Sequence, residues 1–124
     1  MSDPEPFVRR AADVEYRTVD AADGLSKGVL VGPTHGAPNF AIRRFVLEPG
    51  ASVPKHTNEI EHEQYVIDGE YVVGIDDETY TVEAGDSLFI PGGTVHWYRN
   101  DSDEPGSFLC AVPNGVDDMT LLNE

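Results

Sequence analysis

Turn-forming residues interrupt this chain at short intervals. Between residues 39 and 113 the apolar runs are short, and Pro, Gly and Asp close them at turns such as 48–50, 68–69 and 83–86. None of these runs has the period of about 3.6 residues that marks an amphipathic helix. The pattern therefore predicts an all-β fold, a barrel or a sandwich built from short strands.

The length of 124 residues suits a single domain with one buried core. We expect residues 1–38 to form an N-terminal arm with one or two short strands, residues 39–115 to form the barrel, and residues 116–124 to form a C-terminal tail. The expected strands cover residues 14–19, 28–31, 40–47, a short stretch that ends at 56, and then 62–67, 70–75, 79–82, 87–90, 94–99 and 107–112.

The chain is strongly acidic, with 23 Asp and Glu against 8 Lys and Arg and a formal net charge of −15. One interpretation is an ordinary acidic surface. The other is adaptation to a salt-rich cytoplasm, because the Debye length shrinks to about 3 Å at 1 M salt and relieves self-repulsion. The presence of only two lysines, Lys27 and Lys55, favours a halophilic, archaeal-like protein. In either case the charge argues against nucleic acid or an anionic membrane as a partner.

The N-terminal segment predicts no export. Residues 1–10 lack the basic start and apolar stretch of a signal peptide, and no apolar run approaches the ~20 residues that cross a bilayer. Cys110 is the only cysteine, so no disulfide can form within the chain, which suits a reducing compartment. We expect a cytoplasmic protein.

Three of the four histidines fall on strands where alternation can bring them together. Residues i and i+2 share a face of a strand, so His56 and Asn58 point the same way if their segment is extended. His62 and His96 lie on two further strands. If those faces look inward, three imidazoles converge, and imidazoles held on separate strands form a rigid cage for a divalent first-row metal.

Alternation also predicts the residues around these histidines. Gln64 shares a face with His62, and Thr94 and Tyr98 share a face with His96, so all three are expected to line a pocket. Cys110, on the last expected strand, is either an inert core thiol or a redox or substrate contact. Of the neighbours Arg43 and Arg44, one can face the cavity as an anchor for an anion.

Two spaced motifs make the chain resemble a small, single-domain member of the cupin superfamily. The first motif is formed by Gly50, His56, Asn58, His62 and Gly69, and the second by Gly85, Pro91, Gly93, His96 and Asn100. Together they span most of the region between residues 39 and 113. The resemblance implies a double-stranded β-helix of the jelly-roll type. It also implies a homodimer, in which the short N-terminal strands can pair across the subunit boundary and cover a barrel edge.

The first motif departs from the common cupin pattern at two positions. His62 replaces the usual glutamate and is followed by Glu63, which is similar to monocupins whose manganese-like ion is held by four histidines. Asn58 replaces the second histidine, and it can bind the ion directly, bind it through water, or not bind it. Glu63 is expected to point outward or to support an imidazole, although a one-residue slip in register would make it the ligand instead of His62.

The resemblance leaves the activity open. It implies a divalent ion, Mn or Fe first and Zn, Ni or Co otherwise, although some cupins have lost the ion. Open coordination positions beside neutral ligands favour a dioxygenase-like oxidoreductase acting on a small organic molecule. The alternatives are a non-enzymatic sensor or binding module for a small molecule or metal, and a metal-dependent isomerase or decarboxylase. No residue is assigned a catalytic role from the sequence.

Overall fold

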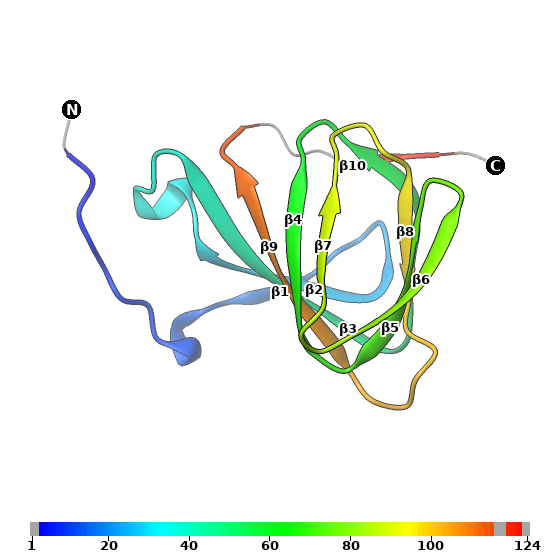
Figure 1. The fold of residues 1–124 in the computed structure, drawn as a ribbon. Helices are drawn as coiled ribbons and strands as arrows, with labels where there is room; N and C mark the ends of the chain where they lie inside the picture. The colour runs from blue at the N-terminus through cyan, green and yellow to red at the C-terminus, as the bar shows by residue number, and fades with distance from the viewer. Residues whose placement is uncertain (1–2, 116–118, 123–124) are drawn as a thin grey trace.

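The computed structural model describes residues 3–115 and 119–122, which form strands and two short 3-10 helices (Figure 1). The strands are β1 Tyr16–Thr18, β2 Asp23–Val31, β3 Phe40–Asn58, β4 His62–Asp68, β5 Glu70–Ile75, β6 Glu78–Glu83, β7 Ser87–Ile90, β8 His96–Arg99, β9 Gly106–Pro113 and β10 Met119–Leu121. The 3-10 helices are η1 Ala11–Asp13 and η2 Pro33–His35. The all-β prediction is confirmed.

The sheet curls around a buried interior. Its strands run in the order β6-β5-β8-β3-β9-β4-β7, with β2 and β10 also paired to β3, and with β1 paired to β2. Figure 1 shows β4 and β7 on one side of the curled sheet and β8, β5 and β6 on the other, with β3 crossing between them. Every strand pairing among the described residues is antiparallel, as expected for strands joined by tight turns.

Strand β3 is a single bent strand of 19 residues, whereas the sequence predicted two strands separated by a turn at residues 48–50. The turn residues bend the strand instead of ending it, because Gly50 adopts a positive φ of 83° that lets the backbone change direction. The first half of β3 pairs with β2 and β9, and the second half pairs with β8 and β10. One strand therefore belongs to both sides of the barrel.

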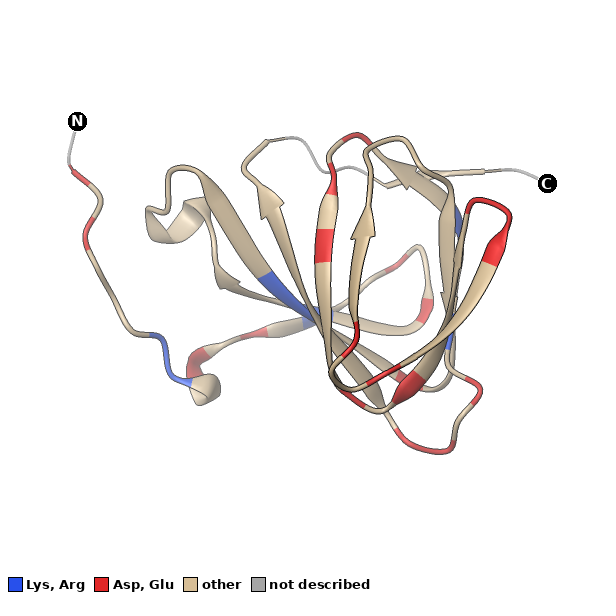
Figure 2. Ribbon diagram, in the orientation of Figure 1, with Lys and Arg blue, Asp and Glu red and all other residues tan. Residues whose placement is uncertain are grey.

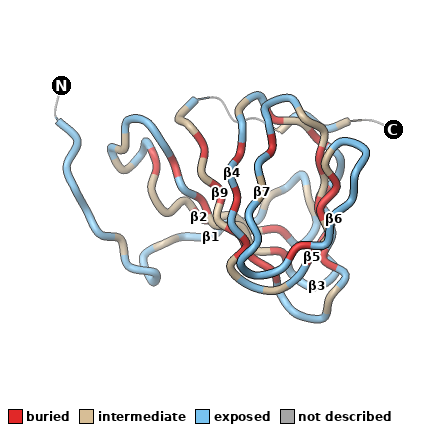
Figure 3. The backbone as a smooth tube through the Cα atoms, in the orientation of Figure 1, coloured by how far each residue is buried: buried red, intermediate tan, exposed pale blue. Residues whose placement is uncertain are grey.

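Side-chain alternation decides which residues enter the core. Along β4, His62, Gln64 and Val66 are buried, whereas Glu63 and Tyr65 are exposed. The tube in Figure 3 shows the same switching between buried and exposed positions on β4, whereas β9 has buried and half-buried residues only. The apolar core contains the residues Leu25, Ala41, Leu47, Ala51, Val53, Val66, Tyr71, Val73, Val82, Tyr98, Phe108, Cys110 and Val112.

Both ends of the chain contribute more to the sheet than the sequence indicated. Strand β2 begins at Asp23, five residues before its expected start at residue 28, and it pairs with β3 from Asp23 to Val31 within the same chain. In the expected C-terminal tail, Met119–Leu121 forms β10, which pairs with residues 56–58 of β3. Because β1 and β2 find their partners within the chain, the homodimer remains a prediction without support from these strands.

In the part of the chain that the structure describes, the acidic residues are spread over strands and loops (Figure 2). This distribution fits both interpretations of the acidity, and the halophilic one remains a prediction. Among the described residues, no helix is long and apolar enough to cross a membrane.

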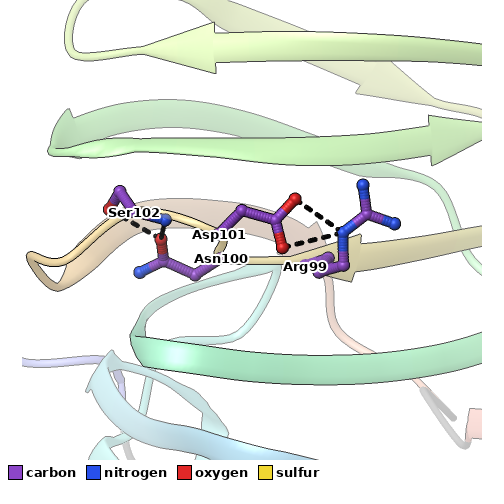
Figure 4. Close-up of polar contacts among 4 residues, drawn as sticks. All are labelled: Arg99, Asn100, Asp101 and Ser102. Carbon is purple, nitrogen blue, oxygen red and sulfur yellow. Dashed lines mark hydrogen bonds and ion pairs between the residues drawn. The ribbon is translucent and has the colours of Figure 1, made fainter.

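A buried asparagine fixes the turn between β8 and β9. The Asn100 side chain is fully buried; its Nδ2 donates to the carbonyl oxygens of Leu47 and Glu104, each at 2.9 Å. Its Oδ1 accepts hydrogen bonds from the backbone N–H and the hydroxyl of Ser102 at 3.0 and 2.8 Å (Figure 4). The Asn100 carbonyl also accepts the N–H of Gly50 at 2.9 Å, so this residue holds the bend of β3 in place.

We expect Asn100→Ala to lower the free energy of unfolding by about 2–4 kcal/mol, because it leaves buried carbonyls without donors. Urea denaturation followed by circular dichroism measures the change. Asp101→Ala is the matched control, since its ion pair with Arg99 is exposed and should contribute less than about 1 kcal/mol. Equal losses in the two variants would contradict this role for Asn100.

Candidate functional site

A cavity of about 220 Å³ lies inside the barrel and contains the histidines of the predicted site. Its polar walls come from β2, β3, β4 and β8, and its apolar walls come from the core, from residues just before β2 and from β10. The lining residues are Val19, Ala21, Leu25, Lys27, Arg43, Phe45, Val53, His56, Asn58, His62, Gln64, His96, Tyr98, Phe108 and Met119. The sequence therefore placed His56, Asn58, His62 and His96 on one cavity, as expected from alternation.

His56 and His96 are each held in the same tautomer by the backbone carbonyl two residues before them. The Nδ1 of His56 lies 2.8 Å from the carbonyl oxygen of Pro54, and the Nδ1 of His96 lies 2.9 Å from that of Thr94. A carbonyl oxygen only accepts, so each Nδ1 must carry the hydrogen, which leaves the lone pair of the neutral ring on Nε2. This arrangement is the one in which a histidine is oriented to bind a metal through Nε2.

The three rings are grouped unevenly. The ring centres of His56 and His96 are 4.1 Å apart, whereas those of His62 and His96 are 6.1 Å apart. Two imidazoles bound at right angles to one ion through nitrogens at about 2.1 Å have ring centres roughly 4.5 Å apart. The first pair fits this spacing and the second is wider. Across the described residues, no group of three or more His, Cys, Asp or Glu side chains is placed so that it could hold a metal ion.

His62 has a polar partner of its own, the thiol of Cys110. His62 forms a hydrogen bond with the thiol of Cys110, which is fully buried behind the cavity wall. Burial alone would raise the pKa of the Cys110 thiol. The hydrogen bond and charge of His62, together with those of Arg43, outweigh burial and hold this pKa below its usual range. Cys110 belongs to the apolar core, and its role as a redox or substrate contact stays a prediction.

Two amide oxygens in the cavity lack hydrogen-bond donors. Asn58 is 8% exposed, and its Oδ1 has no hydrogen-bond partner among the described residues. The same is true of Oε1 of Gln64, whose Nε2 donates to the Tyr98 hydroxyl at 2.8 Å. A buried acceptor without a partner costs about 1–3 kcal/mol, so both oxygens favour a ligand that brings a cation or a hydrogen-bond donor.

The nitrogen and oxygen atoms around the cavity are therefore of the kinds that bind a divalent ion, whereas the spacing of the three histidine rings suits such an ion less well. Two preset imidazole nitrogens and the Asn58 oxygen are suitable ligands, whereas His62 is engaged by Cys110. The metal itself remains a prediction, and so does the identity of the ion.

The remaining predicted residues lie both inside and outside the cavity. Gln64 and Tyr98 line it, as expected. Thr94 does not; it lies in the turn before β8, and only its carbonyl contributes, by orienting His96. Glu63 is on the outer face of β4, so the register has not slipped toward it, and a hydrogen bond with exposed Glu61 raises the pKa of the Glu63 carboxyl.

Two cationic side chains complete the cavity. Of the two neighbouring arginines, Arg43 faces inward and is buried, while Arg44 lies outside beside Asp68 at 3.5 Å. The sequence left this choice open. The sequence analysis missed Lys27, because β2 was expected to begin one residue after it. The alternation of Leu25, Lys27 and Val29 along the strand could have shown that Lys27 belongs to β2 and shares a face with them.

Comparison with known proteins identifies the family. The profile of the Cupin domain matches residues 43–112, more than half of the chain. The chain belongs to the cupin family. The structure of the polyketide cyclase RemF from Streptomyces resistomycificus superposes on this cupin with a TM-score of 0.89 and 26% identity, covering 97% of this chain and 87% of that one. The predicted jelly-roll barrel is therefore confirmed.

Two further proteins resemble this cupin over different extents. Polyketide synthase CurC from Streptomyces cyaneus is 36% identical over 101 residues, which is 81% of this chain but only 58% of the length of that curated relative. The oxalate decarboxylase of Lactobacillus farciminis has a TM-score of 0.79 and 23% identity over 96% of this chain and 36% of that one, which is a likeness of fold alone.

We expect this cupin to bind Mn²⁺ or Co²⁺, and His96→Ala to weaken the binding by about tenfold or more, because a preset imidazole nitrogen is lost. Calorimetric titration of the metal-stripped protein measures the affinity. His35→Ala is the control, since His35 accepts a hydrogen bond from the Gly32 N–H outside the cavity. Equal affinity in the wild type and in His96→Ala would contradict the assignment.

Proposed function

We propose that this cupin is a metal-dependent enzyme that polarises a carbonyl group of a small, unsaturated organic molecule and promotes its cyclisation. The observation that carries the proposal is the composition of the cavity, which combines neutral nitrogen and oxygen atoms that can bind a metal with aromatic side chains. The likeness to CurC and RemF supports the substrate class, because the names of both proteins refer to polyketides, which are rich in carbonyl groups.

The donor set determines what a bound ion would contribute. A divalent ion held by His56, His62, His96 and Asn58 would keep its full charge, since all four ligands are neutral, and would act as a Lewis acid toward a carbonyl oxygen. His56 and His96 are ready for this role because their Nδ1 hydrogens are already engaged. His62 would have to exchange its contact with the Cys110 thiol for the ion.

Tyr98 is the side chain best placed to handle a proton in this cavity. Its hydroxyl accepts a hydrogen bond from Gln64 Nε2 at 2.8 Å, and a phenolic hydroxyl can donate its own hydrogen as well as accept one. The Tyr98 ring lies 5.8 Å from that of His96 and 6.4 Å from that of His56. In the proposed reaction Tyr98 donates to the carbonyl oxygen on which negative charge develops, and Gln64 keeps the hydroxyl in position.

Oxygen activation is the second candidate, and the three imidazole donors are the observation that favours it. It is the oxidoreductase, dioxygenase-like activity expected from the sequence. The two chemistries differ in their products. Intramolecular aldol condensation of a polyketone forms one C–C bond, releases one water and consumes no oxygen, whereas a dioxygenase transfers both atoms of O₂ to its substrate.

The test uses a synthetic aryl triketone that can cyclise by intramolecular aldol condensation. Protein reconstituted separately with Mn²⁺, Fe²⁺, Co²⁺ and Zn²⁺ is followed by mass spectrometry and by an oxygen electrode. We expect loss of one water from the probe without oxygen uptake. Oxygen uptake would favour the dioxygenase, and probe binding without turnover with any metal would favour a non-enzymatic binding module.

We expect Tyr98→Phe to lower kcat by about a hundredfold, with little change in binding of the probe, because the variant loses a proton donor but keeps the ring. Tyr80→Phe is the matched control, since Tyr80 is exposed on β6 and should leave kcat unchanged. Equal kcat in the wild type and in Tyr98→Phe would remove Tyr98 from the reaction.

A further inference from the structure

Among the described residues that line the cavity, the charged side chains are basic, although the protein as a whole is acidic. The chain carries 23 acidic residues and a net charge of −15, yet no Asp or Glu is among the described residues that line the cavity. Its lining does include Arg43 and Lys27, one of the only two lysines in the chain. Two of eight basic residues are thus placed where an anion, rather than a cation, would be attracted.

Lys27 and Arg43 approach the same aromatic ring. The Lys27 Nζ lies 5.9 Å from the centre of the Phe45 ring, and the Arg43 Cζ lies 5.4 Å from it. Lys27 pairs with Phe45 across β2 and β3, and Arg43 is two residues before Phe45, so the two cations are diagonal neighbours on one face. Diagonal neighbours are roughly 7–8 Å apart, which long side chains can bridge to reach one anion.

Phe45 begins a row of stacked rings that continues toward the histidines. Phe45 stacks on Phe108 with centres 5.2 Å apart and planes at 19°, and Phe108 stacks on Tyr98 at 5.4 Å and 20°. Tyr98 then lies beside the His96 ring. We call Phe45, Phe108 and Tyr98 the aromatic wall. A flat, unsaturated ligand complements such a wall better than a saturated one, because stacked aromatic rings stabilise each other beyond the contribution of the apolar area that they bury.

We propose that the cavity selects a flat aromatic carboxylate, whose anionic group binds at Lys27 and Arg43 and whose ring lies along the aromatic wall. This inference deepens the proposed function by naming the charge and shape of its substrate. A carboxylate paired with both a lysine and an arginine forms charge-assisted hydrogen bonds, the stronger class of hydrogen bond in proteins. Hydroxyl groups on the same ligand would supply the donors that the Asn58 and Gln64 oxygens lack.

The experiment compares 2-naphthoate with its neutral amide, 2-naphthamide, on the full chain after the metal has been removed with a chelator. Calorimetry gives the affinity for each compound. We expect naphthoate to bind about tenfold more tightly than the amide, since only the acid can form the charged hydrogen bonds. Equal affinities, or no detectable naphthoate binding at millimolar concentration, would overturn the proposal.

Variants assign the effect to the cavity. Lys27→Met should bring the affinity for naphthoate close to that for the amide, a loss of about tenfold, while amide binding stays the same. Lys55→Met removes the other lysine, which is exposed and does not line the cavity, and should change neither affinity. Equal losses in these two variants would show a general charge effect and overturn the proposal.

Two further variants test the arginine and the ring. Arg43→Lys keeps the charge and should retain part of the preference for naphthoate over the amide. Phe45→Leu should weaken the binding of both compounds by the same factor, because the surface on which their rings stack is lost. Loss of acid binding alone in Phe45→Leu would contradict the aromatic wall. Because all these measurements use metal-free protein and require no turnover, a failed cyclisation assay leaves their outcome unaffected.

Discussion

The bend of β3 at Gly50 is the constraint on which the rest of this barrel depends. One strand of 19 residues has to pair with β2 and β9 before the bend and with β8 and β10 after it. Gly50 permits the change of direction, and buried Asn100 holds it through the Gly50 N–H and the Leu47 carbonyl. The bend brings Arg43 and Phe45, from the first half of the strand, onto the same cavity as His56 and Asn58, from the second half.

The cavity combines two kinds of polar group in different parts of its wall. Near β8 the wall has neutral imidazoles whose nitrogen lone pairs can bind a metal. The part formed by β2 and the first half of β3 has two cationic side chains beside an aromatic ring. A negatively charged surface repels anions at long range, but the Debye length of about 8 Å at physiological salt limits that repulsion to the outside. Selection of an anionic ligand therefore depends on short-range contacts within the barrel.

The sequence predicted the fold class and the set of cavity histidines, because both follow from local rules. Turn residues mark strand ends, and the period of two along β4 and β8 places His62 and His96 inward. It could not show that residues 48–50 bend a strand instead of ending it, since that depends on partners such as Asn100 far along the chain. It also could not give the contact of His62 with Cys110, which results from the register of β4 against β9.

Strand β10 has a consequence for the order in which the protein is completed. Met119 lines the cavity, and its strand pairs with the segment from His56 to Asn58, so one wall is supplied by residues synthesised some sixty positions after the first histidine. While residue 119 is still inside the ribosomal exit tunnel, the nascent barrel has a gap beside its own histidines. An ion or small molecule can therefore meet the full set of cavity walls only after β10 has been translated.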